Sequence, residues 1–338
     1  MRQIWITKTG APEVLQIREA PTPVPANGEV RIRVKASGIS AADIMGRMGR
    51  LRDTPGTPFI PGYEVAGTVD AVAQGVTGFK EGDEVLAITC LGGYSDTICV
   101  PYRQVYKRLE WMNVLDGASL PFDFLTAYAA LIIIGSLHQR DRVLILDATG
   151  GVGLAAQEIC RIVGAETYGT ASQQQHDQLR EHGLVHSIEC DNFDYERAVL
   201  DMTKQRGVDI ILDPSGGVNW TKNYRMLAPG GRLVHYEASI LSAGRQRSAK
   251  SILRTLMHPP TYSPQNLMRD NKAVAGINLA TFLSHAERVQ EWMRQIFAWY
   301  DEALFRPAID STFPFNKATE AHQAMQDHQN FGKILLTP

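Results

Sequence analysis

The stretch 141–170, DRVLILDATGGVGLAAQEICRIVGAETYGT, determines the predicted fold. Residues 143–146 form a continuous apolar run of strand length, and residues 154–163 carry apolar side chains at helical spacing. The glycines between these runs predict a tight turn from a strand into a helix. Residues 165–170, after a glycine stop, predict a second strand. The unit is therefore β-α-β, which is typical of a parallel sheet.

The turn itself matches a dinucleotide-binding fingerprint. Ala148, Gly150 and Gly153 occupy the first, third and sixth positions of G-x-G-x-x-G, with alanine replacing the first glycine. Glycine lets the backbone approach a pyrophosphate, and the N-terminus of the following helix attracts that anion. Glycine-rich turns alone are weak evidence, but the flanking strands support this one. We expect cofactor contacts at Gly150, Gly151, Val152 and Gly153.

The end of the second predicted strand indicates which cofactor is used. An acidic residue there would bind the 2′-hydroxyl of the NAD ribose. This strand instead ends Thr170-Ala171-Ser172, without a carboxylate. The small loop leaves room for a 2′-phosphate and does not repel it, so the sequence favours NADP.

Composition excludes several classes of function. The chain has 338 residues, 44% hydrophobic and 21% charged, as expected for a globular protein of two domains. A net charge of −2 gives no reason to expect a nucleic-acid partner. The longest apolar run, 127–137, is too short to cross a bilayer, and Met1 begins a strand-like segment without a signal-peptide pattern. We expect a cytoplasmic protein with no integral membrane segment.

The four cysteines, Cys90, Cys99, Cys160 and Cys190, contain no C-x-x-C pair. Reduced structural thiols are favoured over metal binding or redox use, and Cys160 falls within a predicted amphipathic helix.

A change in the sequence pattern predicts two domains. Residues 1–122 contain short β-type runs punctuated by Gly and Pro, which predict a β-barrel-like domain. In 123–279, strand-length and helical patterns alternate, which predicts a doubly wound parallel sheet. Its last strand, 273–279, is expected at a sheet edge. Residues 280–338 are expected to return to the first domain and complete it.

Several motifs, in this order, resemble those of a known superfamily. A-T-G-G-V-G, D-P-S-G-G, P-G-G-R-L-V and F-G-K-I-L-L resemble the medium-chain dehydrogenase/reductases along the whole chain. Within them, the chain is most similar to the zinc-free, zeta-crystallin-like quinone oxidoreductases. GTAS, GVDIILDPSGG and RPAIDSTFPF are similar to the branch related to the vesicle amine transport protein. The resemblance implies a Rossmann domain, a discontinuous GroES-like catalytic domain and a homodimer formed through 273–279.

The metal motifs of that superfamily are changed in this chain. Zinc-dependent members have Cys in G-[IV]-C-x-x-D and His in G-H-E, whereas Ser40 and Tyr63 occupy these positions here. The four-cysteine lobe that binds structural zinc is also missing. Because zinc needs such soft or imidazole ligands, we expect no metal. Ser40 also departs from the Asn that quinone reductases of this type usually have.

The resemblance implies hydride transfer from NADPH to a quinone or an α,β-unsaturated carbonyl. Ser40 and Tyr63 are the candidate catalytic residues by position; the alternative for Tyr63 is that it only fills the vacated zinc site. Met45, Met48 and Phe122 are expected to line the substrate cleft, although methionines at such spacing are often ordinary core.

The resemblance also assigns cofactor contacts. Thr126 matches a Thr that touches the nicotinamide, or it caps a helix. Asn330, in N-F-G-K, matches an Asn that reaches the cofactor. Further contacts are expected from Thr170, Ser172, Gln175, Tyr236, Asn278 and Lys333.

Three departures from the relatives affect the cofactor site. Cys190 replaces a Tyr and Gln175 replaces a Lys, so we expect modest NADP affinity. Asp147 stands before the glycines where a small apolar residue is usual, and a buried carboxylate there is costly unless hydrogen-bonded.

Two other classes of function stay open. One is an NADP-binding scaffold with little or no catalytic activity, as suspected for the vesicle branch. The other, a zinc alcohol dehydrogenase, is opposed by Ser40 and Tyr63.

The segment 238–269 has no Asp or Glu. It contains the basic residues Arg245, Arg247, Lys250, Arg254 and Arg269. It is either a solvated basic face, a lid with Arg245 or Arg247 near the phosphates, or a contact with an acidic membrane surface.

Overall fold

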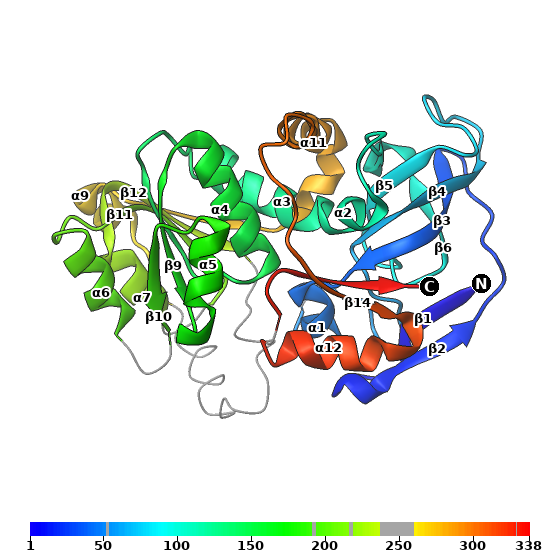
Figure 1. The fold of residues 1–338 in the computed structure, drawn as a ribbon, viewed down its shortest axis with the longest axis horizontal. Helices are drawn as coiled ribbons and strands as arrows, with labels where there is room; N and C mark the ends of the chain where they lie inside the picture. Colours follow the sequence, from blue (N-terminus) through cyan, green and yellow to red (C-terminus); the bar gives the residue numbers. More distant parts are fainter. Residues whose placement is uncertain (52–53, 191–193, 216–218, 237–259, 329) are drawn as a thin grey trace. The chain divides into compact units, whose positions relative to one another are not determined.

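The computed structural model describes residues 1–51, 54–190, 194–215, 219–236, 260–328 and 330–338. The chain forms two compact units, each of which is described by itself. The first consists of Met1–Leu125 and Leu279–Pro338, and the second of Thr126–Asn278 (Figure 1).

The second unit is built on a six-stranded sheet whose strands are all parallel. The strands are β8 (Arg142–Ile145), β9 (Glu166–Ala171), β10 (His186–Glu189), β11 (Val208–Asp213), β12 (Leu227–Tyr236) and β13 (Ala273–Ile277). Their order in space is β10-β9-β8-β11-β12-β13. This is the 3-2-1-4-5-6 order of dinucleotide-binding folds, in which the order reverses between β8 and β11. Ligands bind such sheets at the carboxyl ends of the strands beside that switch point.

Helices connect these strands. They are α4 (Gly151–Val163), α5 (His176–His182), α6 (Tyr195–Met202), α7 (Asn219–Arg225) and α9 (Pro264–Asp270), with a short 3-10 turn at η4 (Gln173–Gln175). A π-helix, η3 (Ala129–Ile134), precedes β8. Helix α4 ends at Gly164, whose φ of 85° is the left-handed conformation that glycine adopts at helix ends. Of the predicted basic segment, 238–259 lie outside the described residues, whereas Arg269 lies in α9 and pairs with Asp270.

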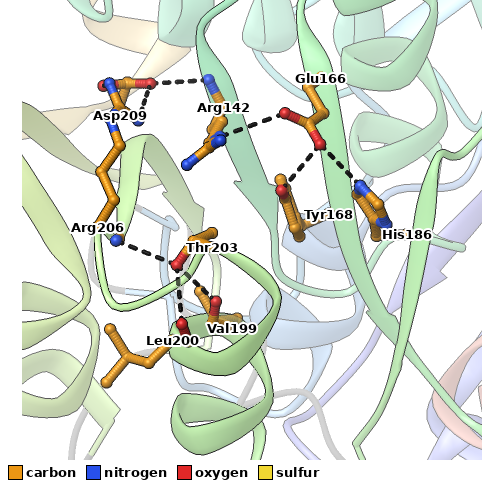
Figure 2. Close-up of polar contacts among 10 residues, drawn as sticks. Arg142, Glu166, Tyr168, His186, Val199, Leu200, Thr203, Arg206 and Asp209 are labelled. Carbon is orange, nitrogen blue, oxygen red and sulfur yellow. Dashed lines mark hydrogen bonds and ion pairs between the residues drawn. The ribbon is translucent and has the colours of Figure 1, made fainter.

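A charged network ties the amino ends of four strands together (Figure 2). Glu166 of β9 accepts hydrogen bonds from Arg142 of β8 (3.3 Å) and Tyr168 (2.9 Å), and it pairs with His186 of β10 (2.8 Å). Asp209 of β11 accepts from the Arg142 backbone N–H at 2.9 Å. Burial opposes ionisation of Glu166, but these hydrogen bonds outweigh it and lower its pKa. Because this edge is occupied by its own ion pairs, a ligand is expected at the opposite, carboxyl edge.

The first unit contains a seven-stranded sheet and a separate hairpin. Its strands follow the order β14-β15-β3-β4-β5-β7, and β6 also pairs with β3. The bounds are β3 (Glu29–Gly38), β4 (Glu64–Val72), β5 (Glu84–Ile88), β6 (Thr97–Pro101), β7 (Val105–Lys107), β14 (Ile309–Pro314) and β15 (Lys333–Thr337). The strands β1 (Arg2–Ile6) and β2 (Leu15–Glu19) form the hairpin. The C-terminal strand β15 pairs with β3 through Leu335 and Gly38, so distant parts of the chain share one sheet.

The helices of this unit pack around the sheet. They are α1 (Ala41–Arg47), α2 (Val114–Ser119), the first part of α3 (Pro121–Tyr128), which continues into the second unit at Thr126, α10 (Leu279–Phe282), α11 (Ala286–Asp301) and α12 (Ala318–Gln326). Short 3-10 turns lie at η1 (Pro12–Val14), η2 (Tyr102–Gln104), η6 (Leu283–His285) and η7 (Phe315–Lys317). Val30, Ile32, Val65 and Val85 alternate into the core of the sheet, as the period of two in the sequence predicts.

Within the described residues, no helix is long and apolar enough to cross a membrane. All four cysteines are described and carry free thiols. Cys160 is buried inside α4, and this burial raises the pKa of its thiol, as expected for a structural residue.

Candidate functional site

The fingerprint turn leads from β8 into the N-terminus of α4. Gly150 is the N-cap residue and, being glycine, has no side chain of its own to cap the helix. The first N–H groups of this thirteen-residue helix point out of its N-terminus. Together with the positive end of the helix dipole, they suit a pyrophosphate. Gly150, Gly151, Val152 and Gly153 lie at this helix N-terminus, and their contacts with a pyrophosphate stay a prediction.

Glycines allow the turn, the helix and β9 to pack closely. A Cβ on Gly153 would overlap the Asp147 carbonyl oxygen and lie 3.0 Å from Ala148 Cα. A Cβ on Gly169 of β9 would lie 2.8 Å from Ala148 Cβ. Gly169 therefore makes room for the alanine that replaces the first glycine of the fingerprint.

Thr170 supports the turn from the neighbouring strand. Its Oγ1 accepts a hydrogen bond from the Asp147 N–H at 3.2 Å, and its carbonyl accepts from the Ala148 N–H at 3.0 Å. Asp147 has a φ of 59°, a left-handed conformation that Asp tolerates better than most residues. Since Asp147 is only half-buried, its carboxylate does not bear the full cost of burial.

Ser172 and Gln175, both predicted to read the ribose, lie together at the end of β9. Ser172 Oγ donates to Gln175 Oε1 at 3.0 Å, and the Gln175 N–H donates to the Ser172 carbonyl at 3.0 Å. The carboxyl end of β9 thus leads into a neutral polar turn, η4, and residues 170–175 include no acidic side chain.

A buried polar network that the sequence analysis missed lies at the carboxyl ends of β11 and β12. Asp213 accepts hydrogen bonds from the Ser215 N–H (2.7 Å), Ser215 Oγ (2.6 Å) and Asn223 Nδ2 (2.7 Å), and His235 Nδ1 lies 3.4 Å away. Burial opposes ionisation, yet these partners keep the Asp213 pKa below its ordinary value. Asp213 ends β11, so it and the fingerprint turn flank the switch point. Asp-Pro-Ser after a predicted strand was the available signal, because Asp favours such a turn.

Two further residues that were predicted to contact the cofactor lie at the ends of the next strands. Tyr236 is the buried last residue of β12, and Asn278 follows β13.

In the first unit, the altered zinc motifs form a hydrogen-bonded cluster. Ser40 caps α1, because its Oγ accepts from the Asp43 N–H at 3.4 Å. In return, the Ser40 N–H and Oγ each donate to Asp43 Oδ2 at 2.9 Å. Asp43 Oδ1 accepts from the Gly62 N–H at 2.7 Å, which joins the two motifs. Burial is the main cause that raises the Asp43 pKa to about 6. Ser40 is 3% exposed, so its hydroxyl has a structural partner in addition to any catalytic role.

The rings of Tyr63 and Phe122 lie together, with their centres 5.6 Å apart and their planes at 49°. Met45 is 2% exposed, and the half-buried Met48 packs against the cluster that contains Ile4. As residues of the cleft wall, the two methionines and Phe122 stay a prediction.

Lys333 lies inside a buried ion cluster. Its Nζ lies 3.1 Å from Asp123 Oδ2 and pairs with Glu64 Oε1. Glu64 Oε2 accepts from the Phe122 N–H at 2.8 Å. Burial raises the Glu64 pKa to about 7 and also raises that of Asp123, while the two carboxylates raise that of Lys333 despite its burial. Lys333, predicted to bind the cofactor, is thus held by carboxylates of the protein.

The two remaining candidate cofactor contacts, Asn330 and Thr126, lie three residues away in sequence from Lys333 and Asp123. Asn330 is buried and donates from Nδ2 to the Gly332 carbonyl at 2.6 Å. Thr126 lies inside α3 and is 3% exposed. The alternative that Thr126 is a helix cap is therefore wrong.

Among the described ranges, no group of three or more His, Cys, Asp or Glu side chains could hold a metal ion.

Comparisons with known proteins agree with this geometry. A family model described as zinc-binding dehydrogenase matches residues 188–336, and one described as alcohol dehydrogenase GroES-like domain matches residues 26–110. The synaptic vesicle membrane protein VAT-1 homolog of Rattus norvegicus is 37% identical over 325 residues, 96% of this chain and 80% of that protein. The quinone oxidoreductase of Homo sapiens is 29% identical over 326 residues, 96% of this chain and 93% of that protein.

A solved structure shows the same similarity. The crystal structure of human synaptic vesicle membrane protein VAT-1 homolog-like protein has a TM-score of 0.87 and 28% identity, covering 100% of this chain and 98% of that one. The chain therefore belongs to the medium-chain dehydrogenase/reductases, an oxidoreductase superfamily, and within it to the branch of VAT-1 homologues. The predicted fold class, a parallel Rossmann sheet with a GroES-like domain, is confirmed.

Proposed function

We propose that this protein is an NADPH-dependent oxidoreductase that reduces a quinone or an α,β-unsaturated carbonyl without zinc. The observation that supports this most is the switch point of the second unit. There, the N-terminus of α4, which begins after a glycine N-cap, adjoins a β9 end that leads into a neutral turn. This geometry suits a dinucleotide pyrophosphate next to a 2′-phosphate.

The chain's own residues would bind and orient the reactants. The N–H groups of α4 would hold the pyrophosphate, and Ser172 with Gln175 would face the 2′-phosphate without charge repulsion. When bound, the nicotinamide would supply a hydride; an enone would accept it at its β-carbon and take up a proton from solvent at its α-carbon, and a quinone would accept the hydride and take up a proton from solvent to become a hydroquinone. Tyr63 is the candidate that donates a hydrogen bond to the developing oxyanion. Thr126 and Asn330 are proposed cofactor contacts.

Zinc independence is part of the proposal. Asp43, which lies in the metal motif, is fully occupied by Ser40 and the Gly62 N–H. Neither Ser40 nor Tyr63 supplies the thiolate or imidazole that zinc prefers.

We also propose a division of labour between the two units. Residues 123–279 would form the dinucleotide-binding domain, and 1–122 with 280–338 would form the catalytic domain, in which Asn330 would also contact the cofactor. The edge strand β13 would join two copies into a homodimer, and the location would be cytoplasmic.

The second candidate function is an NADPH-binding scaffold with little catalysis. It is favoured by the vesicle-protein names of the relatives and by Cys190 and Gln175, which depart from the residues expected near the adenosine.

Binding and turnover separate the two candidates. NADPH affinity is measured by its fluorescence, and NADPH oxidation is then followed with a panel of quinones and enones. The reductase proposal expects both binding and acceptor-dependent oxidation. Binding with no oxidation by any acceptor would leave the scaffold, and failure to bind NADPH would contradict both.

A further inference from the structure

Three buried charges join three elements of the first unit. Glu64 begins β4, Asp123 lies in the first turn of α3, and Lys333 begins β15. Their side chains are 1%, 8% and 3% exposed. Moving charged side chains out of water costs free energy that their mutual attraction often does not recover. A buried ion cluster is therefore weak evidence of stabilisation. A role in fixing local geometry accounts for it better.

Two members of this triad directly follow aromatic residues of the candidate site in the sequence. Tyr63 precedes Glu64, and Phe122 precedes Asp123. The Phe122 N–H donates to Glu64 Oε2 at 2.8 Å, and Lys333 Nζ lies 5.7 Å from the centre of the Phe122 ring. The triad therefore holds Phe122 through its backbone and through its ring.

The triad is closely enclosed. A Cβ on Gly38 would overlap Glu64 Oε1 and lie 2.6 Å from Lys333 Cε. Ser37, the neighbour of Gly38, donates from Oγ to the Glu64 carbonyl at 3.0 Å. Because β3 packs closely against the triad, water has little room to solvate a change in the triad's charge. Such a change must therefore act on the neighbouring side chains.

We propose that the Glu64–Lys333–Asp123 triad positions Tyr63 and Phe122 for reduction of the substrate, and that protonation of Glu64 releases them. This inference rests on the proposed function. With both carboxylates ionised, two ion pairs hold the start of β4 and the start of α3 on Lys333. With Glu64 protonated, its ion pair is lost and its hold on the Phe122 N–H weakens.

The charge change falls near neutral pH. Burial raises the Glu64 pKa to about 7, and Asp123 adds to that rise while Lys333 opposes it. Asp43 of α1 and Tyr94, after β5, also act on the triad electrostatically. The turnover number is therefore expected to rise as pH increases through about 7.

Glu64→Gln tests the proposal, because it keeps the shape and an acceptor for the Phe122 N–H but cannot ionise. It should lower kcat about tenfold at pH 8, with KM for NADPH within about threefold of wild type, and remove the neutral step of the pH profile. Asp116→Asn is the matched control, since Asp116 is a buried carboxylate of the same unit that accepts from Tyr300 OH at 2.5 Å. It should keep the step.

Asp123→Asn gives a second, signed test if Glu64→Gln does not fold. Because the Asp123 charge raises the Glu64 pKa, its removal should move the step to lower pH. A purely structural role predicts no such movement.

A readout without turnover separates this proposal from the proposed function. Fluorophenylalanine at position 122 is observed by ¹⁹F NMR in the ligand-free protein. Its chemical shift should titrate near pH 7 in wild type and stay flat in Glu64→Gln. A titrating signal without any turnover would refute the proposed function but support the triad. A flat wild-type signal, or equal pH profiles for wild type and Glu64→Gln, would overturn the triad proposal.

Discussion

The backbone N–H of Asp147 donates a hydrogen bond of 3.2 Å to Thr170 Oγ1, which ties the fingerprint turn to the end of β9. Thr170→Val keeps the side-chain shape but removes this acceptor. The free energy of unfolding should fall by about 1 kcal/mol, and NADPH affinity should fall because the turn loses its support. Urea unfolding and fluorescence titration measure the two effects.

Thr167→Val is the control for that change. Thr167 lies in the same strand, and its Oγ1 accepts from the Val185 N–H at 3.1 Å, away from the turn. It should lose similar stability with unchanged NADPH affinity. Equal losses of NADPH affinity in both variants would show that the turn has no special role.

Cofactor choice is expected to depend on the neutral turn after β9. Ser172→Asp places a carboxylate where the 2′-phosphate is proposed to lie. It should weaken NADPH binding about tenfold, or ~1.4 kcal/mol, and reverse the preference for NADPH over NADH. Ser284→Asp adds the same charge at an exposed position of the other unit and should change neither affinity. Equal affinity of the wild type for both cofactors would count against this assignment.

Assembly is expected to use β13. This strand pairs with β12, and no strand among the described residues pairs with its other edge. Gly276 is exposed there, and a Cβ would meet only the His235 carbonyl, at 3.9 Å. Gly276→Lys should convert a homodimer into a monomer by light scattering, because charged edge strands resist pairing. A wild-type monomer at micromolar concentration would remove the dimer proposal.

Asp43 should make stability depend on pH. Its folded pKa, about 6, lies above the ordinary 3.8, so the folded state binds this proton more tightly. Its contribution is fully present below pH 3.8 and is lost as pH rises to about 6, by roughly 3 kcal/mol at most. In Asp43→Asn, urea unfolding between pH 4 and 6.5 should lack this component of the slope. A slope identical to that of wild type would show that Asp43 ionises normally.

Local sequence patterns predicted the elements of the fold well. The apolar runs around 141–170 have the periods of a strand and of a helix, so β8, α4 and β9 lie where they were expected. The capping box of Ser40 and Asp43 was also visible as S-x-x-D before a helix. The same two residues also belong to the altered zinc motif, so the pattern fits two interpretations.

Contacts between distant segments could not be predicted in this way. Nothing local to Lys333 indicates that it meets Glu64 and Asp123, because the sheet pairing of β15 with β3 brings them together. The methionines are assigned to the cleft by position alone, and Met45 is buried. Asp213 begins the D-P-S-G-G motif, but its partner His235 lies on the next strand, β12.

Deuterium transfer tests the central claim most directly. Protein treated with a metal chelator is given NADPH deuterated at C4 of the nicotinamide and an enone acceptor, and the product is analysed by mass spectrometry and NMR. Zinc-independent hydride transfer predicts one deuterium at the β-carbon of the product, at the same rate with and without the chelator. Unchanged enone despite demonstrated NADPH binding, or activity abolished by the chelator and restored by zinc, would contradict it.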